Sequence, residues 1–253
     1  MNIKKIIEDI RDFLSTLSKG EKEVREYRRH SEPHAFFDSQ DIHVELDSCK
    51  EIILQDETQL ELGGVNKTSF SLIYPLHLPD FIKNGKITLI GPEIPDLADD
   101  SINFGLFMLI GFGQISEKDF DDLKHFSFVS NGIEGSMIRT IPRRFWCRIS
   151  NDVADRFSFE FLGNAIFHLY EEKFGKLIHA MELIFISSHA DLVEKFEALT
   201  SEIRDHLDKR WRDKIEEWKK RIDCDYDWEC NVCPYFDACD DVREVLEERE
   251  KIS

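Results

Sequence analysis

The sequence has no long uninterrupted run of apolar residues. In the N-terminal segment, MNIKKIIEDIRDFLSTL, charged residues are threaded through the apolar positions. A signal peptide needs a continuous apolar core and a membrane-spanning helix needs about 20 predominantly apolar residues, so this segment fits neither. We therefore expect a cytoplasmic protein with no membrane partner.

Basic residues are scarce compared with acidic ones. The chain has 33 Lys and Arg against 51 Asp and Glu, which gives a formal net charge of -18. A protein with this charge is repelled by nucleic-acid phosphates and by anionic lipid surfaces unless a local basic patch intervenes. We therefore expect no nucleic-acid partner.

Cysteine is also sparse, with six residues in 253. Cytoplasmic thiols are kept reduced, so these cysteines are better explained as metal ligands or buried thiols than as disulfides. The glycine segments at 111–113 and 131–135 lack the spacing of a dinucleotide or P-loop motif and are expected to be turns.

Hydrophobic spacing predicts helices at both ends of the chain and a sheet between them. Apolar residues recur every three or four positions from Ile3 to Leu17 and again from Leu192 to Ile222, as they do on one face of a helix. Between these segments, β-branched and aromatic runs predict strands within 42–74, at 86–94, at 143–150 and at 177–187. A helix is expected over 159–174, before Gly175.

This pattern predicts an α/β fold, with a mixed sheet and flanking helices, followed by a helical C-terminal module that carries cysteines. We expect three parts. Residues 1–39 form an N-terminal helical segment, residues 40–188 form one mixed α/β domain, and residues 189–253 form a long helix and a four-cysteine metal module.

The strongest single signal is a cysteine cluster, Cys224, Cys230, Cys233 and Cys239, spaced C-x5-C-x2-C-x5-C. The C-x2-C pair allows two thiolates to turn toward one ion or cluster. Pro234 after Cys233 is typical of iron-sulfur ligation, whereas zinc knuckles usually carry two C-x2-C pairs. The spacing leaves iron-sulfur and zinc both open.

A series of short motifs resembles the acetyl-CoA synthase family, the beta subunit of the CO dehydrogenase/acetyl-CoA synthase complex. The matching runs are LELGGVNKTSFSLI, NGKITLIGPEIPDL, NGIEG, RRFWCRIS, FLGNAIFHLYEEKFGKLIHAMELIFIS and ECNVC, in this order between Leu60 and Cys233. In that family a CoA-binding domain precedes a 4Fe-4S cluster that a cysteine bridges to two nickel ions. The resemblance thus implies a 4Fe-4S cluster in an anaerobic one-carbon metabolism, with zinc as the alternative.

The resemblance also implies a CoA site. The family associates a tryptophan and surrounding arginines with CoA, and Trp146 and Arg148 occupy the matching places in RRFWCRIS. Arg139, Arg143 and Arg144 complete the densest basic stretch of the chain. Guanidinium groups suit the phosphates of CoA and an indole can stack on adenine. The alternative is that Trp146 is a core residue and that the arginines pair with nearby carboxylates.

Departures from the family limit what can be transferred. Cys230 and Cys233 match the first ligands and Cys239 the third, but Cys224 precedes the pair, whereas the family's fourth ligand follows it. The Cys-Gly-Cys tripeptide that holds the distal nickel is absent from the sequence, which argues against a complete nickel centre.

Three functions therefore remain open from the sequence. The first is an accessory or electron-transfer module with a 4Fe-4S cluster, whose partner would be a CO dehydrogenase, a corrinoid protein or a methyltransferase. The second is a CO-methylating acetyl-CoA synthase-like acyltransferase with cluster-bound nickel. The third is a zinc-stabilised interaction domain. The sequence does not identify catalytic residues.

Overall fold

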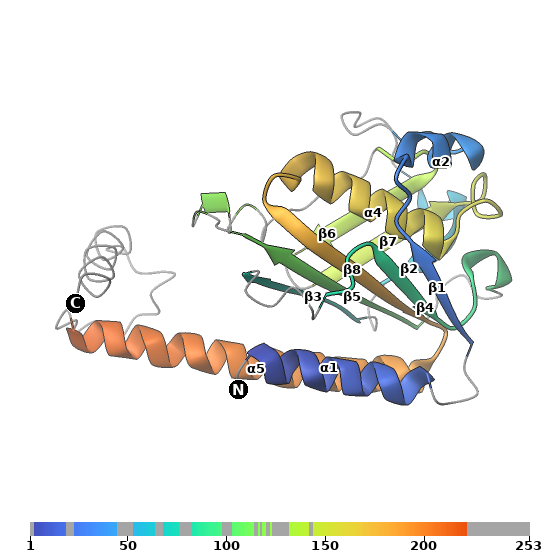
Figure 1. Ribbon diagram of the computed structural model, residues 1–253. Helices are drawn as coiled ribbons and strands as arrows, with labels where there is room; N and C mark the ends of the chain where they lie inside the picture. The colour runs from blue at the N-terminus through green and yellow to red at the C-terminus, as the bar shows by residue number, and fades with distance from the viewer. Residues whose placement is uncertain are drawn as a thin grey trace. The chain divides into compact units, whose positions relative to one another are not determined.

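The computed structural model describes residues 3–18, 23–44, 53–63, 68–75, 82–97, 103–113, 116, 118–119, 122, 132–141 and 144–221 (Figure 1). The chain divides into two compact units, one of residues 2–200 and the other of Met1 with residues 201–253. In the second unit the described residues are 201–221, which are helical.

In the described residues, strands β2 to β7 follow one another and α-helices lie before and after them. The α-helices are α1 (Ile3–Ser18), α2 (Pro33–Ser39), α4 (Phe159–Phe174) and α5 (Ala190–Arg221). The strands are β1 (Val24–Arg28), β2 (Thr58–Leu62), β3 (Thr68–Pro75), β4 (Lys86–Ile90), β5 (Phe104–Phe112), β6 (Ser136–Ile141), β7 (Arg144–Ser150) and β8 (Ile178–Ser187).

The main sheet has five strands in the order β1-β4-β8-β5-β3. Strand β8 lies at its centre, parallel to β4 and antiparallel to β5. Strand β1 pairs antiparallel with β4 at one edge, and β3 pairs parallel with β5 at the other. The mixture of directions fits the expected mixed α/β fold.

A second sheet has three antiparallel strands in the order β2-β7-β6. Gly63, which follows β2, has a φ of 78°. A Cβ atom at Gly63 would lie 2.1 Å from the carbonyl oxygen of Phe145 on the neighbouring strand. Glycine is therefore required where β2 ends beside β7.

Aromatic side chains fill the space on both faces of the main sheet. On one face, helix α4 and the second sheet supply Phe159 and Phe145, whose rings lie 6.2 and 5.7 Å from that of Phe104 on β5. On the other face, Phe107 of the same strand contacts Phe196 in the first turns of α5, with ring centroids 5.2 Å apart. The side chains of a strand alternate between faces, so a strand that is buried throughout, as β5 is, serves both layers.

Within residues 2–200, α4 lies over one face of the main sheet and α1 lies on the opposite face (Figure 1). Helix α4 begins where the Ser158 side chain accepts a hydrogen bond from the Phe161 N–H at 3.0 Å. This is the usual N-cap contact. Helix α2 packs on α4 through Phe37, whose ring lies 5.3 Å from that of Phe161.

The mixed α/β class predicted from the sequence is confirmed for the described residues. The segment 1–39, expected to be helical, contains the strand β1 between α1 and α2, because its backbone pairs with β4. The cysteine-bearing part of the predicted C-terminal module lies outside the described residues. None of the helices in the described part of the chain is long and apolar enough to cross a membrane.

Candidate functional site

The outward face of the second sheet carries two of the residues that the sequence predicts for CoA. Along β7, Phe145, Cys147 and Ile149 are buried, so the intervening Trp146 and Arg148 lie on the opposite, outward face. Along β2, Leu60 and Leu62 are buried, and Glu61 between them also faces outward.

Register brings an acidic side chain to this face. Glu61 lies directly opposite Arg148 in the antiparallel pairing of β2 with β7. The Arg148 Nε donates a hydrogen bond to Glu61 Oε2 at 2.8 Å, and about a quarter of each side chain is exposed. An arginine with one carboxylate partner on a half-exposed sheet is a typical cross-strand pair.

Trp146 forms the second contact of this arginine. The central carbon of the Arg148 guanidinium lies 5.0 Å from the centroid of the indole ring. This distance is within the range of a cation–π interaction. Trp146 is partly exposed, and the bond of Arg148 to Glu61 is what the alternative to a CoA site expects of an arginine, so the choice between the two interpretations stays a prediction.

These two contacts leave the end of the guanidinium unused. The Glu61 bond engages Nε, and no other residue in the described part of the chain makes a hydrogen bond or an ion pair with the two terminal nitrogens of Arg148. The terminal nitrogens of an arginine match the spacing of two oxygens of a phosphate or carboxylate. The geometry therefore combines a positioned donor pair with an aromatic surface.

Of the other three predicted arginines, the structure describes the backbone positions of two. Arg139 on β6 lies opposite Trp146 in the register, and Arg144 on β7 lies opposite Ile141. Arg143 lies outside the described residues. The structure thus brings Trp146 and Arg148 together, and the contribution of the remaining three arginines stays a prediction.

The metal ligands predicted from the sequence, Cys224, Cys230, Cys233 and Cys239, lie outside the described residues. Within the described ranges, no group of three or more His, Cys, Asp or Glu side chains is arranged to hold a metal ion. Cys147, expected to be an inward-facing thiol, is fully buried on β7. Burial raises the pKa of its thiol, so Cys147 is unsuited to act as a nucleophile.

A cavity lies near the end of β7 that the sequence did not predict. It has a volume of about 460 Å³ and is lined by Asp56, Glu134, Asp152 and Arg156, among others. The Arg156 guanidinium is already bonded to the carboxylate of Asp41 at 3.0 Å. With Glu57, four carboxylates surround one paired cation and would repel the phosphates of CoA, so this cavity does not suit that ligand.

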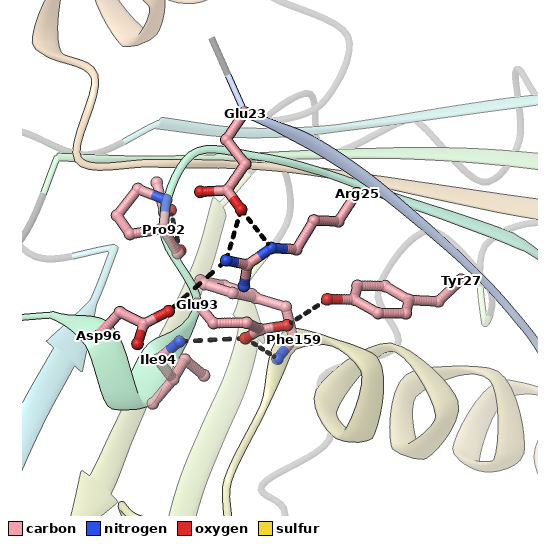
Figure 2. A network of polar contacts seen from close by, with 9 residues as sticks. Glu23, Arg25, Tyr27, Pro92, Glu93, Ile94, Asp96 and Phe159 are labelled. Atoms are coloured by element: carbon pink, nitrogen blue, oxygen red, sulfur yellow. Dashed lines mark hydrogen bonds and ion pairs between the residues drawn. The ribbon is translucent and has the colours of Figure 1, made fainter.

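Two buried carboxylates join elements around the main sheet. The first is Glu93, which follows β4 and is 9% exposed. Its Oε1 accepts a hydrogen bond from the Tyr27 hydroxyl at 2.9 Å, and its Oε2 accepts from the Ile94 N–H at 3.0 Å and from the Phe159 N–H at 2.9 Å (Figure 2). Glu93 therefore joins β1, the end of β4 and the first turn of α4.

Glu93 lies beside the N-terminal end of α4. Phe159 is the first residue of α4, and the N-terminus of a helix favours a negative charge. Burial, followed by the hydrogen bond to Glu93, raises the pKa of Tyr27 to about 12. At the surface of this network, Arg25 pairs with Glu23 at 2.6 Å and lies 3.6 Å from Asp96 (Figure 2).

The second buried carboxylate is Glu182 on the central strand β8, which is 1% exposed. Arg11 of α1 donates to both of its oxygens, at 2.9 and 2.6 Å, and the Lys83 N–H donates at 2.9 Å. This contact fixes α1 on the sheet face that Glu182 points to. All these donors match the carboxylate geometry, so we interpret the pair as structural.

Sequence reasoning missed both carboxylates. The available signal was a single acidic residue inside an otherwise apolar segment, which is Glu93 in LIGPEIP and Glu182 in LIHAMELIFIS. Because a charge is buried only when it is paired, an isolated acid in such a run predicts a partner elsewhere in the fold. The pattern does not say which residue that partner is.

Residues 42–192 match the family model described as the CO dehydrogenase/acetyl-CoA synthase complex beta subunit. This range contains both β7 and the two buried carboxylates, and it covers more than half of the chain.

Curated proteins named as beta subunits of the acetyl-CoA decarbonylase/synthase complex are similar to the chain. The acetyl-CoA decarbonylase/synthase complex subunit beta of Methanopyrus kandleri is 27% identical over 190 residues, which are 74% of this chain and 39% of the relative. Subunit beta 2 of Methanosarcina thermophila is 29% identical over 182 residues, which are 70% of this chain and 36% of the relative. The match thus spans less than two-fifths of either relative. On the extent of the family match, the chain belongs to the family of the CO dehydrogenase/acetyl-CoA synthase complex beta subunit.

Proposed function

We propose that the chain is an iron-sulfur accessory or electron-transfer component of acetyl-CoA metabolism that binds CoA on the outward face of the β2-β7-β6 sheet. The observation that carries the CoA part is the guanidinium of Arg148, whose terminal nitrogens have no partner in the described part of the chain, 5.0 Å from the indole of Trp146. Family membership supports the link to acetyl-CoA chemistry.

The donor chemistry of this face fits CoA. Its phosphates would accept hydrogen bonds from the terminal nitrogens of Arg148, and its adenine would stack on Trp146. The negative charge of Glu61 reduces the attraction between this face and a phosphate. A second cation would offset that charge, and Arg139, whose backbone lies opposite Trp146, is the candidate.

Isothermal titration calorimetry with CoA tests this part of the proposal. We expect binding that weakens at least about 10-fold in Arg148→Ala, the loss of one charge-assisted donor pair. The matched control is Arg25→Ala, because Arg25 is also a strand arginine with a carboxylate partner but lies on β1 of the other sheet. If the chain does not bind CoA, or if both variants weaken binding equally, the CoA proposal is wrong.

The iron-sulfur part of the proposal rests on the spacing of Cys224, Cys230, Cys233 and Cys239 together with family membership. Metal and sulfide analysis of protein purified without oxygen tests it. We expect about four irons and four sulfides per chain and no nickel. Cys230→Ser should abolish the iron absorbance, while Cys147→Ala, at a buried thiol of the sheet, should retain it.

The other possible results identify the other two functions. Nickel in addition to iron would favour an acyltransferase over an accessory component. One zinc and no iron would contradict the iron-sulfur proposal and favour a zinc-stabilised interaction domain. The partner of an electron-transfer component would be a CO dehydrogenase, a corrinoid protein or a methyltransferase, and copurification under anaerobic conditions is the measurement that identifies it.

A further inference from the structure

We propose that Glu61 is a positioning residue for anion recognition, because it holds Arg148 so that its two terminal nitrogens point to a phosphate group. The inference rests on the proposed CoA site and deepens it, since it specifies the group of the ligand that is recognised and the residue that prepares the site. The geometry of the ion pair between Glu61 and Arg148 supports this role.

A carboxylate can bind an arginine end-on or side-on. An end-on pair uses the terminal nitrogens and consumes the donors that a ligand would need. Here Glu61 Oε2 accepts from Nε at 2.8 Å, on the side of the guanidinium. The carboxylate therefore restricts the arginine without occupying the terminal nitrogens.

The indole of Trp146 restricts the remaining freedom. The side chain of Arg148 starts two residues from Trp146 on the same face of β7, and its guanidinium lies 5.0 Å from the ring centroid. One contact from the neighbouring strand and one from the same strand together define the position of the group. A long side chain that is ordered before binding loses less entropy when the ligand arrives.

The two terminal nitrogens of Arg148 suit two oxygens of one tetrahedral phosphate group. CoA offers two kinds of phosphate, the diphosphate bridge and the 3′-phosphate, and both have the same chemistry toward an arginine. Dephospho-CoA retains the bridge and lacks the 3′-phosphate, whereas pantetheine lacks all phosphates. The three ligands, with inorganic diphosphate as a fourth, separate these sources.

The test is calorimetric titration of the whole protein and of the variants Glu61→Ala, Glu61→Gln and Arg148→Lys with these four ligands. Glu61→Ala should bind CoA and diphosphate about 3- to 10-fold more weakly than Glu61→Gln, because both variants lack the negative charge and only the alanine lacks the acceptor that orders the long side chain of Arg148. Glu61→Gln should rescue binding to at least the original affinity, because the amide oxygen still accepts from Nε and the repulsive charge is removed. Arg148→Lys should weaken binding, because an ammonium lacks the paired donors.

Two controls separate positioning from a general effect of the substitution. Pantetheine binding should be unchanged in Glu61→Ala, because that ligand has no phosphate. Glu26→Ala removes the same charge from a strand ion pair with Lys86 in the main sheet and should leave CoA affinity unchanged. A loss of dephospho-CoA binding assigns the bridge as the recognised group, and a loss confined to CoA assigns the 3′-phosphate.

Each contrary result has a definite meaning. If Glu61→Ala binds phosphates as tightly as Glu61→Gln, the positioning role is wrong even though CoA binding stands. If diphosphate binding depends on Glu61 and CoA does not bind, the proposed function fails and the anion site remains. If neither ligand binds, both are wrong.

Discussion

Replacing Glu93 by alanine tests whether the buried carboxylate network stabilises the fold. The substitution removes the acceptor of three hydrogen bonds, two of them from backbone N–H groups at 2.9 and 3.0 Å. A hydrogen bond to a charged group contributes about 1.5–3 kcal/mol, and a buried donor without a partner costs about 1–3 kcal/mol. Water that enters the 9% exposed site recovers part of this loss. We therefore expect the free energy of unfolding to fall by roughly 3–5 kcal/mol.

Urea unfolding followed by circular dichroism measures this loss. A double-mutant cycle with Tyr27→Phe isolates the hydroxyl contact, for which we expect a coupling of about 1–2 kcal/mol. The control is Glu23→Ala, since Glu23 is a carboxylate of the same network that is 58% exposed and should cost less than about 1 kcal/mol. A loss below about 1 kcal/mol for Glu93→Ala, or no coupling to Tyr27, would refute the reasoning.

Three further predictions concern ionisable groups of the fold. Because the pKa of Tyr27 is raised to about 12 from 10.0, this hydroxyl ionises first in the unfolded chain. Stability should therefore be unaffected below pH 10 and fall between pH 10 and about 12. Urea midpoints should show a less steep fall in Tyr27→Phe. Burial, and then the charge of His34, lowers the pKa of His168 from 6.5, so stability should fall as the pH drops below 6.5, and His168→Gln should reduce that fall in the same assay. The Cys147 thiol, whose pKa is raised by burial, should react with iodoacetamide only after unfolding, and labelling of this residue in the native protein would contradict its burial.

The long elements could be predicted from the sequence because their signals are local. The three- and four-residue apolar spacing of α1 and α4 and the apolar run of β8 are contained within each segment. Strand β1 could not be predicted in this way. Its sequence, VREYR, is largely polar, and it becomes a strand because residues about 60 positions later in β4 supply its hydrogen-bond partners.

The same distinction applies to the candidate site. Trp146 and Arg148 are two residues apart, so any strand through them places both on one face, and the sequence suffices to pair them. Glu61 is 87 residues away from Arg148 and reaches it only through the register of β2 with β7. Likewise, Glu182 finds Arg11 across 171 residues. Both ion pairs form only in the folded protein, and no local sequence pattern predicts which residues they join.

The predicted metal ligands are a third case, because the sequence predicts which residues act together but not which metal they bind. Their spacing is a local signal, and it predicts that Cys224, Cys230, Cys233 and Cys239 act together. The choice between iron-sulfur and zinc depends on the geometry around the sulfurs and on the metal supplied, neither of which a spacing determines. That choice stays a prediction that metal analysis decides.

The central position of β8 has a consequence for synthesis on the ribosome. Strands β4 and β5 are both made before β8, yet they do not pair with each other, because β8 lies between them in the sheet. Until residues 178–187 have left the exit tunnel, the described strands of the main sheet can form only two separate pairs, β1 with β4 and β3 with β5. Such pairs are marginal in water and expose apolar edges. The main sheet is therefore joined into one unit only when β8 enters at its middle, and until then the edges of both pairs stay open to intermolecular contacts.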